Sequence, residues 1–327
     1  MSERVLADAV AEEKPRIDAV MAAVCRRVVG QDRAVKMLVA TCLAGGHALL
    51  EDVPGTGKTR LASSLAAALG LSFARVQGTP DLLPSDVIGT TVYHPREEVF
   101  RFHPGPIFTQ VLLFDEINRA TPRTQSALLQ AMAEQAVTVD GDVKPLPKPF
   151  LVLATANPVE SQGVFPLPEA ELDRFLVQVS LGYLPAPQEV DMVRRVLAEA
   201  DQDSAPDAVL DPDRVVSLQR LVRRIFVHDE VLQYAVSLAR RTREHDQISL
   251  GASPRSAVWL VRLSQALALL AGRHFVTPDD VQEAFVPVMR HRLVFDIAWA
   301  EREERDRLLQ SILGDTPVPH EREVNAP

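Results

Sequence analysis

A glycine-containing segment, PGTGKT at residues 54–59, separates two stretches of different periodicity. Before it, His47 to Val53 (HALLEDV) is a short apolar run that predicts a β-strand. After it, Lys58 to Leu69 places apolar residues at helical spacing. In such a strand–loop–helix unit, the N–H groups of the loop and the N-terminus of the helix can bind a phosphate. The segment therefore predicts an α/β fold with a phosphate loop.

The residue types of this loop predict how it would hold a nucleoside triphosphate. Lys58 is expected to reach the β and γ phosphates, and Thr59 to hold Mg²⁺ through its hydroxyl, because Mg²⁺ prefers oxygen ligands. One position departs from the pattern G-x-x-x-x-G-K-[ST], since residue 52 is Asp52 and not glycine. If Asp52 distorted the loop, the chain would bind nucleotide without hydrolysing it, and this alternative stays open. The predicted phosphate-binding residues are Pro54, Gly55, Thr56, Gly57, Lys58 and Thr59.

Apolar runs alternate with helical stretches along the first half of the chain. Apolar strands between helices indicate a mainly parallel sheet with both faces covered. The further strands predicted are Ser72–Gln77, Val111–Phe114, Phe150–Thr155 and Phe175–Leu181, with a helix over Gln125–Gln135. Two stretches, Thr91–Phe102 and Val137–Leu146, alternate around turn residues and predict inserted hairpins.

The remaining segments read as helical. Residues 3 to 28 have helical spacing interrupted by Pro15, which predicts two short helices, and a further helix from Gly30 ends at Gly45-Gly46. After Tyr183 no convincing strand follows, and Thr277-Pro278-Asp279-Asp280 is a typical helix start. We therefore expect a core domain over 1–184, with its N-terminal helices, and an all-helical domain over 185–327 that ends in a short flexible tail.

Composition excludes several classes of protein. The 327 residues are 46% hydrophobic and 24% charged, with a net charge of −9, so a domain-wide basic surface for nucleic acid is not expected. No uninterrupted apolar stretch reaches the ~18 residues of a membrane span, and the acidic N-terminus does not resemble a secretory signal, so a cytoplasmic location is expected. Cys25 and Cys42 are expected to be small buried hydrophobic residues.

Two carboxylates follow the predicted strand at Val111–Phe114. A phosphate loop that hydrolyses its nucleotide needs one acid near the metal and another to activate the attacking water. Asp115 is expected to face Mg²⁺, and Glu116 to polarise water for in-line attack on the γ-phosphate. An Asp-Glu pair can also simply cap a solvated helix, but its place directly after a buried strand favours the catalytic interpretation.

Three later polar residues complete the predicted site. Asn157 follows the strand at Phe150–Thr155 and is expected to hold the attacking water, while Arg174 and Arg255 supply positive charge to the transition state. Each arginine alone is most often a surface ion pair, so their assignment rests on their order in the chain. Arg119 could reach a neighbouring subunit's nucleotide or cap a helix. Gln77 could restrain Glu116, or be an ordinary polar strand end.

From residue 28 to residue 293 the chain resembles the MoxR-type AAA+ ATPases. The blocks that carry the resemblance occur in one order, which makes it specific. They are VVGQDRAV, LLEDVPGTGKT, TPDLLPSDVIGT, FRFHPGPIF, LLFDEINRA, TQSALLQAMAEQAVTVDG, LATANPVE, FPLPEAELDRF, GASPRS and RHRL.

The resemblance implies a P-loop ATPase core with a helical lid, usually assembled as a hexameric ring that remodels or matures client proteins. By resemblance, Lys58 and Thr59 belong to Walker A, Asp115 and Glu116 to Walker B, and ATP and Mg²⁺ are bound. Asn157 is then sensor 1, Arg174 the arginine finger and Arg255 sensor 2. A von Willebrand factor A domain protein is the implied partner.

Two other motor classes share these blocks and stay open. A chelatase-like motor inserts a metal into a cofactor, and the ATPase motifs do not separate it from the chaperone interpretation. A nucleic-acid motor is disfavoured by the acidic balance and by the lack of a basic stretch interleaved with aromatics. The hairpin residues Tyr93, His94 and Phe100 are candidate client contacts, although Phe100 could equally pack its hairpin onto the domain.

Overall fold

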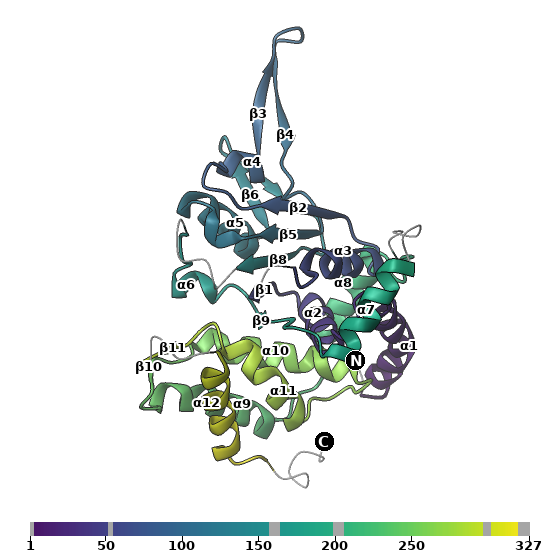
Figure 1. Ribbon diagram of the computed structural model, residues 1–327, viewed down its shortest axis with the longest axis vertical. Helices are drawn as coiled ribbons and strands as arrows, with labels where there is room; N and C mark the ends of the chain where they lie inside the picture. Colours follow the sequence, from purple (N-terminus) through teal and green to yellow (C-terminus); the bar gives the residue numbers. More distant parts are fainter. Residues whose placement is uncertain (1–2, 52–54, 157–163, 199–205, 297–301, 320–327) are drawn as a thin grey trace.

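A five-stranded parallel sheet forms the centre of the N-terminal half (Figure 1). The fold is that of a computed structural model, which describes residues 3–51, 55–156, 164–198, 206–296 and 302–319. The order across the sheet is β2-β5-β8-β1-β9. The strands are β1 (Ala48–Glu51), β2 (Phe73–Gln77), β5 (Val111–Asp115), β8 (Leu151–Ala156) and β9 (Val177–Val179). The predicted parallel sheet is confirmed.

Both faces of this sheet are buried because its central strands are apolar at consecutive positions. In β5, Val111 and Leu113 join one hydrophobic cluster, while Leu112 and Phe114 join another on the opposite face. The first cluster includes α1 (Glu3–Arg27), α2 (Asp32–Ala44) and α3 (Lys58–Ala68). The second is covered chiefly by α5 (Pro122–Glu134), with α4 (Pro84–Ile88), the 3₁₀ helix η1 (Ile117–Arg119) and α6 (Glu169–Leu172) beside it.

The predicted break at Pro15 is wrong, because α1 continues through it from Glu3 to Arg27. Proline removes one helical hydrogen bond and strains the preceding turn. Buried residues lie on both sides of it along one face, Leu6 and Val10 before and Ile17 and Val20 after. Packing of this continuous apolar face stabilises the helix across the proline.

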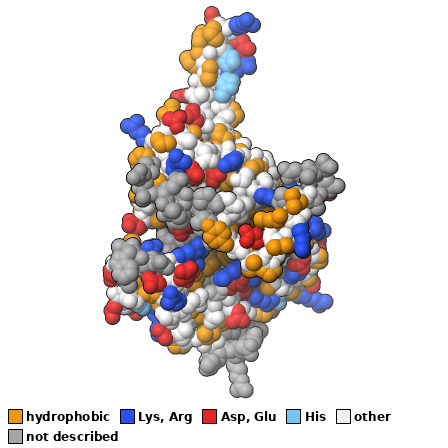
Figure 2. All heavy atoms as spheres, in the orientation of Figure 1, with side chains coloured by type: hydrophobic (Ala, Val, Ile, Leu, Met, Phe, Trp, Pro, Cys, Tyr) orange, Lys and Arg blue, Asp and Glu red, His pale blue; other side chains and the backbone are white. Residues whose placement is uncertain are grey.

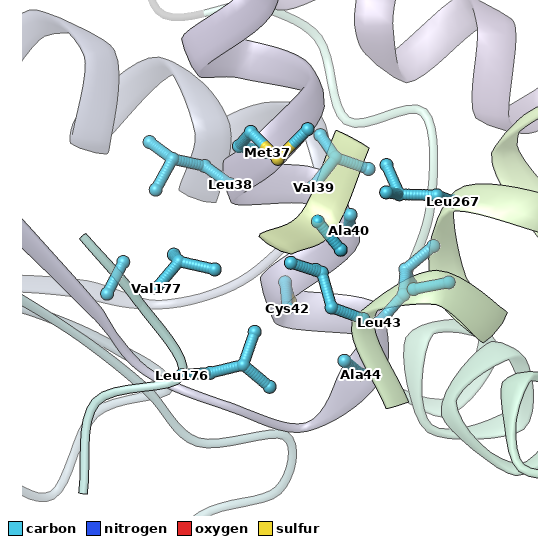
Figure 3. Packing of buried hydrophobic residues seen from close by; sticks show 14 of the residues in the cluster. Met37, Leu38, Val39, Ala40, Cys42, Leu43, Ala44, Leu176, Val177 and Leu267 are labelled. Carbon is cyan, nitrogen blue, oxygen red and sulfur yellow. The ribbon is translucent and has the colours of Figure 1, made fainter. Parts of the chain in front are cut away.

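Helix α2 lies between the sheet and the C-terminal helices. Figure 3 shows its residues Met37 to Ala44 with Leu176 and Val177 of the β9 segment near one side and Leu267 of α10 near another. The helix ends at Gly45, whose φ of 74° is left-handed, as the sequence predicted. One hydrophobic cluster therefore runs from the sheet into the C-terminal half, across the boundary predicted near residue 185, which stays a prediction.

Two antiparallel hairpins are inserted in the core, as predicted. The longer one, β3 (Gly89–His94) with β4 (Val99–Pro104), projects at the top of Figure 1. The shorter pairs β6 (Ala136–Val139) with β7 (Asp142–Pro145). Figure 2 shows hydrophobic side chains on the projecting hairpin, where Phe100 is 72% exposed and its ring lies 5.1 Å from that of Tyr93.

The C-terminal half is mainly helical, and most of its helices lie below the sheet in Figure 1. Its helices are α7 (Ala186–Ala198), α8 (Pro212–Val222), α9 (Asp229–Glu244), α10 (Pro254–Leu270), α11 (Pro278–Met289) and α12 (Arg302–Asp315). The predicted start of α11 is confirmed, since the Asp280 carboxylate accepts from the Thr277 N–H at 2.8 Å. The expectation of no strand after residue 183 is wrong, because β10 (Ile248–Leu250) pairs with β11 (Val294–Phe295). Within the described ranges, no helix has the length and apolar character to cross a membrane.

A buried histidine directly before β1 contacts the neighbouring strand β8 and the helix α5. The His47 Nδ1 accepts from the N–H of Val152 at 3.0 Å, so its Nε2 carries the proton and lies 3.4 Å from the Met132 carbonyl oxygen. Burial lowers the pKa of His47 from 6.5 to about 4. Protonation of Nδ1 would remove the acceptor for the Val152 N–H, so the native state favours the neutral His47 ring.

We therefore predict that His47 makes stability fall with acid. Below pH 6.5 the unfolded chain protonates this ring, whereas the native state resists until about pH 4. The contribution of His47 to the free energy of unfolding is intact above pH 6.5. It falls by up to about 3 kcal/mol as the pH is lowered from 6.5 to about 4. Chemical denaturation at several pH values should give a shallower pH slope for His47→Gln than for wild type, and parallel curves would contradict the prediction.

Candidate active site

The phosphate loop enters α3 through two glycines with left-handed backbone. Gly55 has φ +82° and Gly57 has φ +88°, and a Cβ at either would meet no atom of the described residues within 4 Å. The conformation, not crowding, therefore requires glycine at these positions. Gly57 is the N-cap residue of α3, which begins at Lys58, so the first N–H groups of the helix face the loop. Pro54 and Asp52 lie outside the described residues.

Asp115 ends β5 beside the end of β8. Its Oδ1 accepts from the hydroxyl of Thr155 at 2.5 Å, and its Oδ2 accepts from Nη2 of Arg75 at 2.7 Å. The side chain is 14% exposed, so the carboxylate is mostly shielded but reachable from the carboxyl edge of the sheet. Arg75 reaches it because β2 lies next to β5, with Gln77 opposite Asp115 in register.

Glu116 follows directly, with a left-handed backbone that is uncommon for a residue with a side chain. Its φ is 54°, and its N–H donates to Thr155 Oγ1 at 2.8 Å. This turn directs the carboxylate away from the strand. Its Oε2 accepts from Gln77 Nε2 at 2.7 Å and from Arg119 Nη1 at 3.0 Å. Thr155 thus holds both acidic residues, one through its proton and the other through its oxygen.

One hydrogen-bonded chain of side chains joins the two acids, and we call it the acid network: Asp115, Arg75, Gln77, Glu116 and Arg119. Arg75 Nη2 also donates to Gln77 Oε1 at 3.1 Å, which turns the Gln77 amide nitrogen toward Glu116. The two arginine side chains are 48% and 43% exposed, so they can move without opening the core. Each carboxylate is thus neutralised by a movable cation of the same chain.

Arg174 and Arg255 lie apart from this network. Asn157 is outside the described residues, and the strand before it ends at Ala156, opposite Glu51 of β1. Arg174 lies between α6 and β9 and donates to the Leu129 carbonyl of α5 at 3.0 Å, while its buried Nε has no hydrogen-bond partner among the described residues. Arg255, in the first turn of α10, belongs to the lid.

A cavity of about 220 Å³ lies where the core meets the lid, beside the end of β1. Gln178, which lines it, donates to the Glu51 carboxylate just before the phosphate loop. Sequence reasoning did not assign these lining residues, although Gly30 and Gln31 stand in the VVGQDRAV block. The other lining residues include Ala34, Met37, Ser180, Pro287, Arg290 and Arg302.

Comparison with known proteins decides the family. A model of the ATPase family associated with various cellular activities (AAA) matches residues 47–177, and an AAA lid domain model matches residues 240–312. Chaperone MoxR1 of Mycobacterium tuberculosis is 37% identical over 330 residues, covering 98% of this chain and 86% of that protein. The chain is a MoxR-family AAA+ ATPase.

Two further proteins are similar to this chain over nearly its whole length. The protein YeaC of Bacillus subtilis is 41% identical over 302 residues, covering 91% of this chain and 93% of YeaC. The crystal structure of a proposed ATPase from Cytophaga hutchinsonii superimposes with a TM-score of 0.87 at 34% identity, covering 96% of this chain and 98% of the other. The α/β core and helical lid predicted from the sequence are therefore confirmed, and the protein is an ATPase.

Thr155 gives a direct test of how this MoxR-family site is held. Thr155→Val keeps the shape but leaves the Glu116 N–H without an acceptor and removes a donor from Asp115, which should cost about 1–3 kcal/mol of stability. ATP turnover should fall about tenfold or more, since both acids lose their positioning partner. Thr155→Ser keeps the hydroxyl and is the matched control. Equal steady-state turnover in Thr155→Val and Thr155→Ser would contradict this account.

Proposed function

We propose that this ATPase hydrolyses ATP with Asp115 at the metal and Glu116 as the general base. The observation that carries the proposal is the pair of acids at the end of β5, both bonded to Thr155 at the edge of the sheet next to β1 and its phosphate loop. The carboxyl ends of parallel strands share one edge, where such folds bind nucleotides. Lys58 and the N–H groups of α3 would bind the phosphates there.

The residues present fit Mg²⁺. Asp115 offers a partly exposed carboxylate and Thr59 a hydroxyl in the first turn of α3, and both are the hard oxygen donors that Mg²⁺ prefers. When bound with the nucleotide, Mg²⁺ would neutralise charge on the phosphate oxygens. Arg75 now holds Asp115 Oδ2, so it would have to release that oxygen for the metal.

Glu116 would take the proton from the attacking water and so make the oxygen a better nucleophile. In the acid network its Oε2 already accepts two hydrogen bonds, from Gln77 and Arg119. This arrangement favours a restrained resting state, in which Glu116 is held away from the water. Asn157 would orient the same water, and Arg255 would contact the γ-phosphate from the lid.

Arg174 fits best as a residue that serves the nucleotide of a neighbouring subunit. Within its own chain it bonds to α5, and neither Asp115 nor Glu116 is its partner. A guanidinium supplied to a neighbour's site stabilises the charge of the transition state. The active unit would then be a ring, and a hexamer is the expected assembly.

We propose that the ring acts as a MoxR-type chaperone that remodels or matures client proteins. The support is the similarity to Chaperone MoxR1 and the projecting hairpin with exposed Tyr93 and Phe100. A von Willebrand factor A domain protein is the proposed partner, and insertion of a cofactor into a client is one form of the activity. The alternatives are a chelatase-like motor and a nucleic-acid motor, and strong stimulation of turnover by DNA at low salt would favour the latter.

Two substitutions test the catalytic assignment. Lys58→Ala should abolish ATP binding, because it removes the cation that reaches the β and γ phosphates. Glu116→Gln should bind ATP with little change in affinity and lower turnover by about a hundredfold or more, because the amide cannot accept the proton. Steady-state phosphate release and equilibrium ATP binding measure the two effects. Unchanged turnover in both variants would show that the assignment is wrong.

The restraint on Glu116 gives a prediction of opposite sign. Gln77→Ala removes the 2.7 Å hydrogen bond to Glu116 and should raise basal ATP turnover by a few-fold. The free energy of one hydrogen bond to a charged group sets the upper limit of this increase. Gln110→Ala is the matched control, because Gln110 bonds to Ser72 at the opposite end of the same strands. Turnover lowered in Gln77→Ala, with Gln110→Ala unchanged, would mean that Gln77 assists the base instead of restraining it.

A further inference from the structure

An arginine of the lid is buried in the connection that carries Arg174. Arg292 is 2% exposed and its Nε donates to Asp173 Oδ1 at 2.7 Å. Nη1 donates to the carbonyls of Leu176, at 3.1 Å, and Val288, and Nη2 donates to those of Asp173, at 3.4 Å, and Phe175. These five hydrogen bonds supply an acceptor for each of the five N–H groups of the guanidinium. Burial lowers the pKa of Arg292 only to about 10, so it is charged at neutral pH.

The neighbouring His291 adds a bond to the same segment. Its Nε2 lies 3.0 Å from the Phe175 carbonyl oxygen, which can only accept, so Nε2 carries the proton. Burial lowers the pKa of His291 well below 6.5, and the ring stays neutral. Residues 291–292 therefore attach the end of α11 to the start of β9 through bonds that water does not reach.

Asp173 connects this buried attachment to the helix that carries Arg255. Its Oδ2 accepts from the hydroxyl of Ser253, the N-cap of α10, at 3.3 Å. Arg255 Nη1 lies 4.0 Å from the same oxygen. Asp173 is also the residue directly before Arg174, and the segment enters the sheet where the Leu176 N–H donates to the His47 carbonyl at 2.7 Å. Asp173 therefore bonds to the first turn of the helix that carries Arg255 and is the sequence neighbour of Arg174.

We infer that Asp173 and Arg292 are positioning residues that set where Arg174 and Arg255 point. This inference rests on the proposed roles of those two arginines. Because one carboxylate holds the N-terminus of α10 and lies beside Arg174, a displacement of the lid moves both cations together. Asp173 and Arg292 thereby link the segment that carries Arg174 to the helix that carries Arg255.

The two arginines at Asp173 differ in exposure. Arg292 is buried and fully bonded, whereas Arg255 is 62% exposed and lies only at the edge of ion-pair distance. Arg292 keeps Asp173 neutralised when Arg255 leaves it for a phosphate. Without Arg292, Asp173 would keep Arg255 from the position that it takes in the transition state.

The experiment compares Arg292→Lys with Arg273→Lys in the full-length protein. Lysine has three donors, so it leaves carbonyls of the segment without partners. Arg273→Lys alters another lid arginine, paired with Asp280 at 2.7 Å, that has no contact with Asp173, and is the matched control. We expect Arg292→Lys to lower kcat about tenfold or more with little change in AMP-PNP affinity, while Arg273→Lys keeps kcat near wild type. Equal kcat in folded Arg292→Lys and wild type would overturn the inference.

Asp173→Asn supplies a second variant if Arg292→Lys does not fold, because Arg292 keeps its four bonds to carbonyl groups. It should show the same fall in kcat at unchanged AMP-PNP affinity. In an Arg174→Ala, Arg255→Ala background, Asp173→Asn should cause no further fall, whereas a merely structural role would lower turnover and melting temperature in both backgrounds.

The controls also separate this inference from the proposed function. If Arg174→Ala and Arg255→Ala leave kcat unchanged, the proposed roles of these arginines fail and the inference falls with them. If both lower kcat while Asp173→Asn and Arg292→Lys do not, only the positioning inference fails.

Discussion

Burial of both faces of the central sheet is the constraint on which the rest of the structure depends. Strands such as β5 are apolar at consecutive positions, so helices must cover both faces, and the strands then run parallel with helical connections. Parallel strands end at one edge. The edge brings Asp115 and Thr155, from strands 40 residues apart in sequence, within 2.5 Å of each other. The position of the proposed catalytic acids therefore follows from hydrophobic burial.

Much of the fold could be predicted because local rules and tertiary packing agree. The five strands, both hairpins, the cap at Gly45 and the start of α11 each carry a periodic or capping pattern. Two expectations failed where packing opposed the local rule. Pro15 lies inside α1 because the apolar face continues on both sides of it. The short strands β10 and β11 carry too few residues for a pattern, and only the fold of the lid brings them together.

The candidate site was predictable in part. Asp115, Glu116 and the loop around Lys58 stand out because motif and strand context coincide. Arg75 does not, because an arginine on a strand reads as a solvated residue until the register places Gln77 opposite Asp115. Thr155 reads as the polar end of a strand, and only the structure shows its hydroxyl between the two acids. The sequence shows Arg292 only as part of the RHRL block. Its burial depends on residues that lie 116–119 positions earlier in the chain.

The position of α2 also limits how the lid can move relative to the core. Its residues lie in one apolar cluster with β9 on one side and α10 on another, so a lid that swung open would expose this surface to water. Each 100 Å² of apolar surface uncovered costs about 2.5 kcal/mol. Small sliding of packed helices keeps that surface dry. Motion of the lid against the core within one chain is therefore expected to be such sliding, and not an opening of this apolar contact.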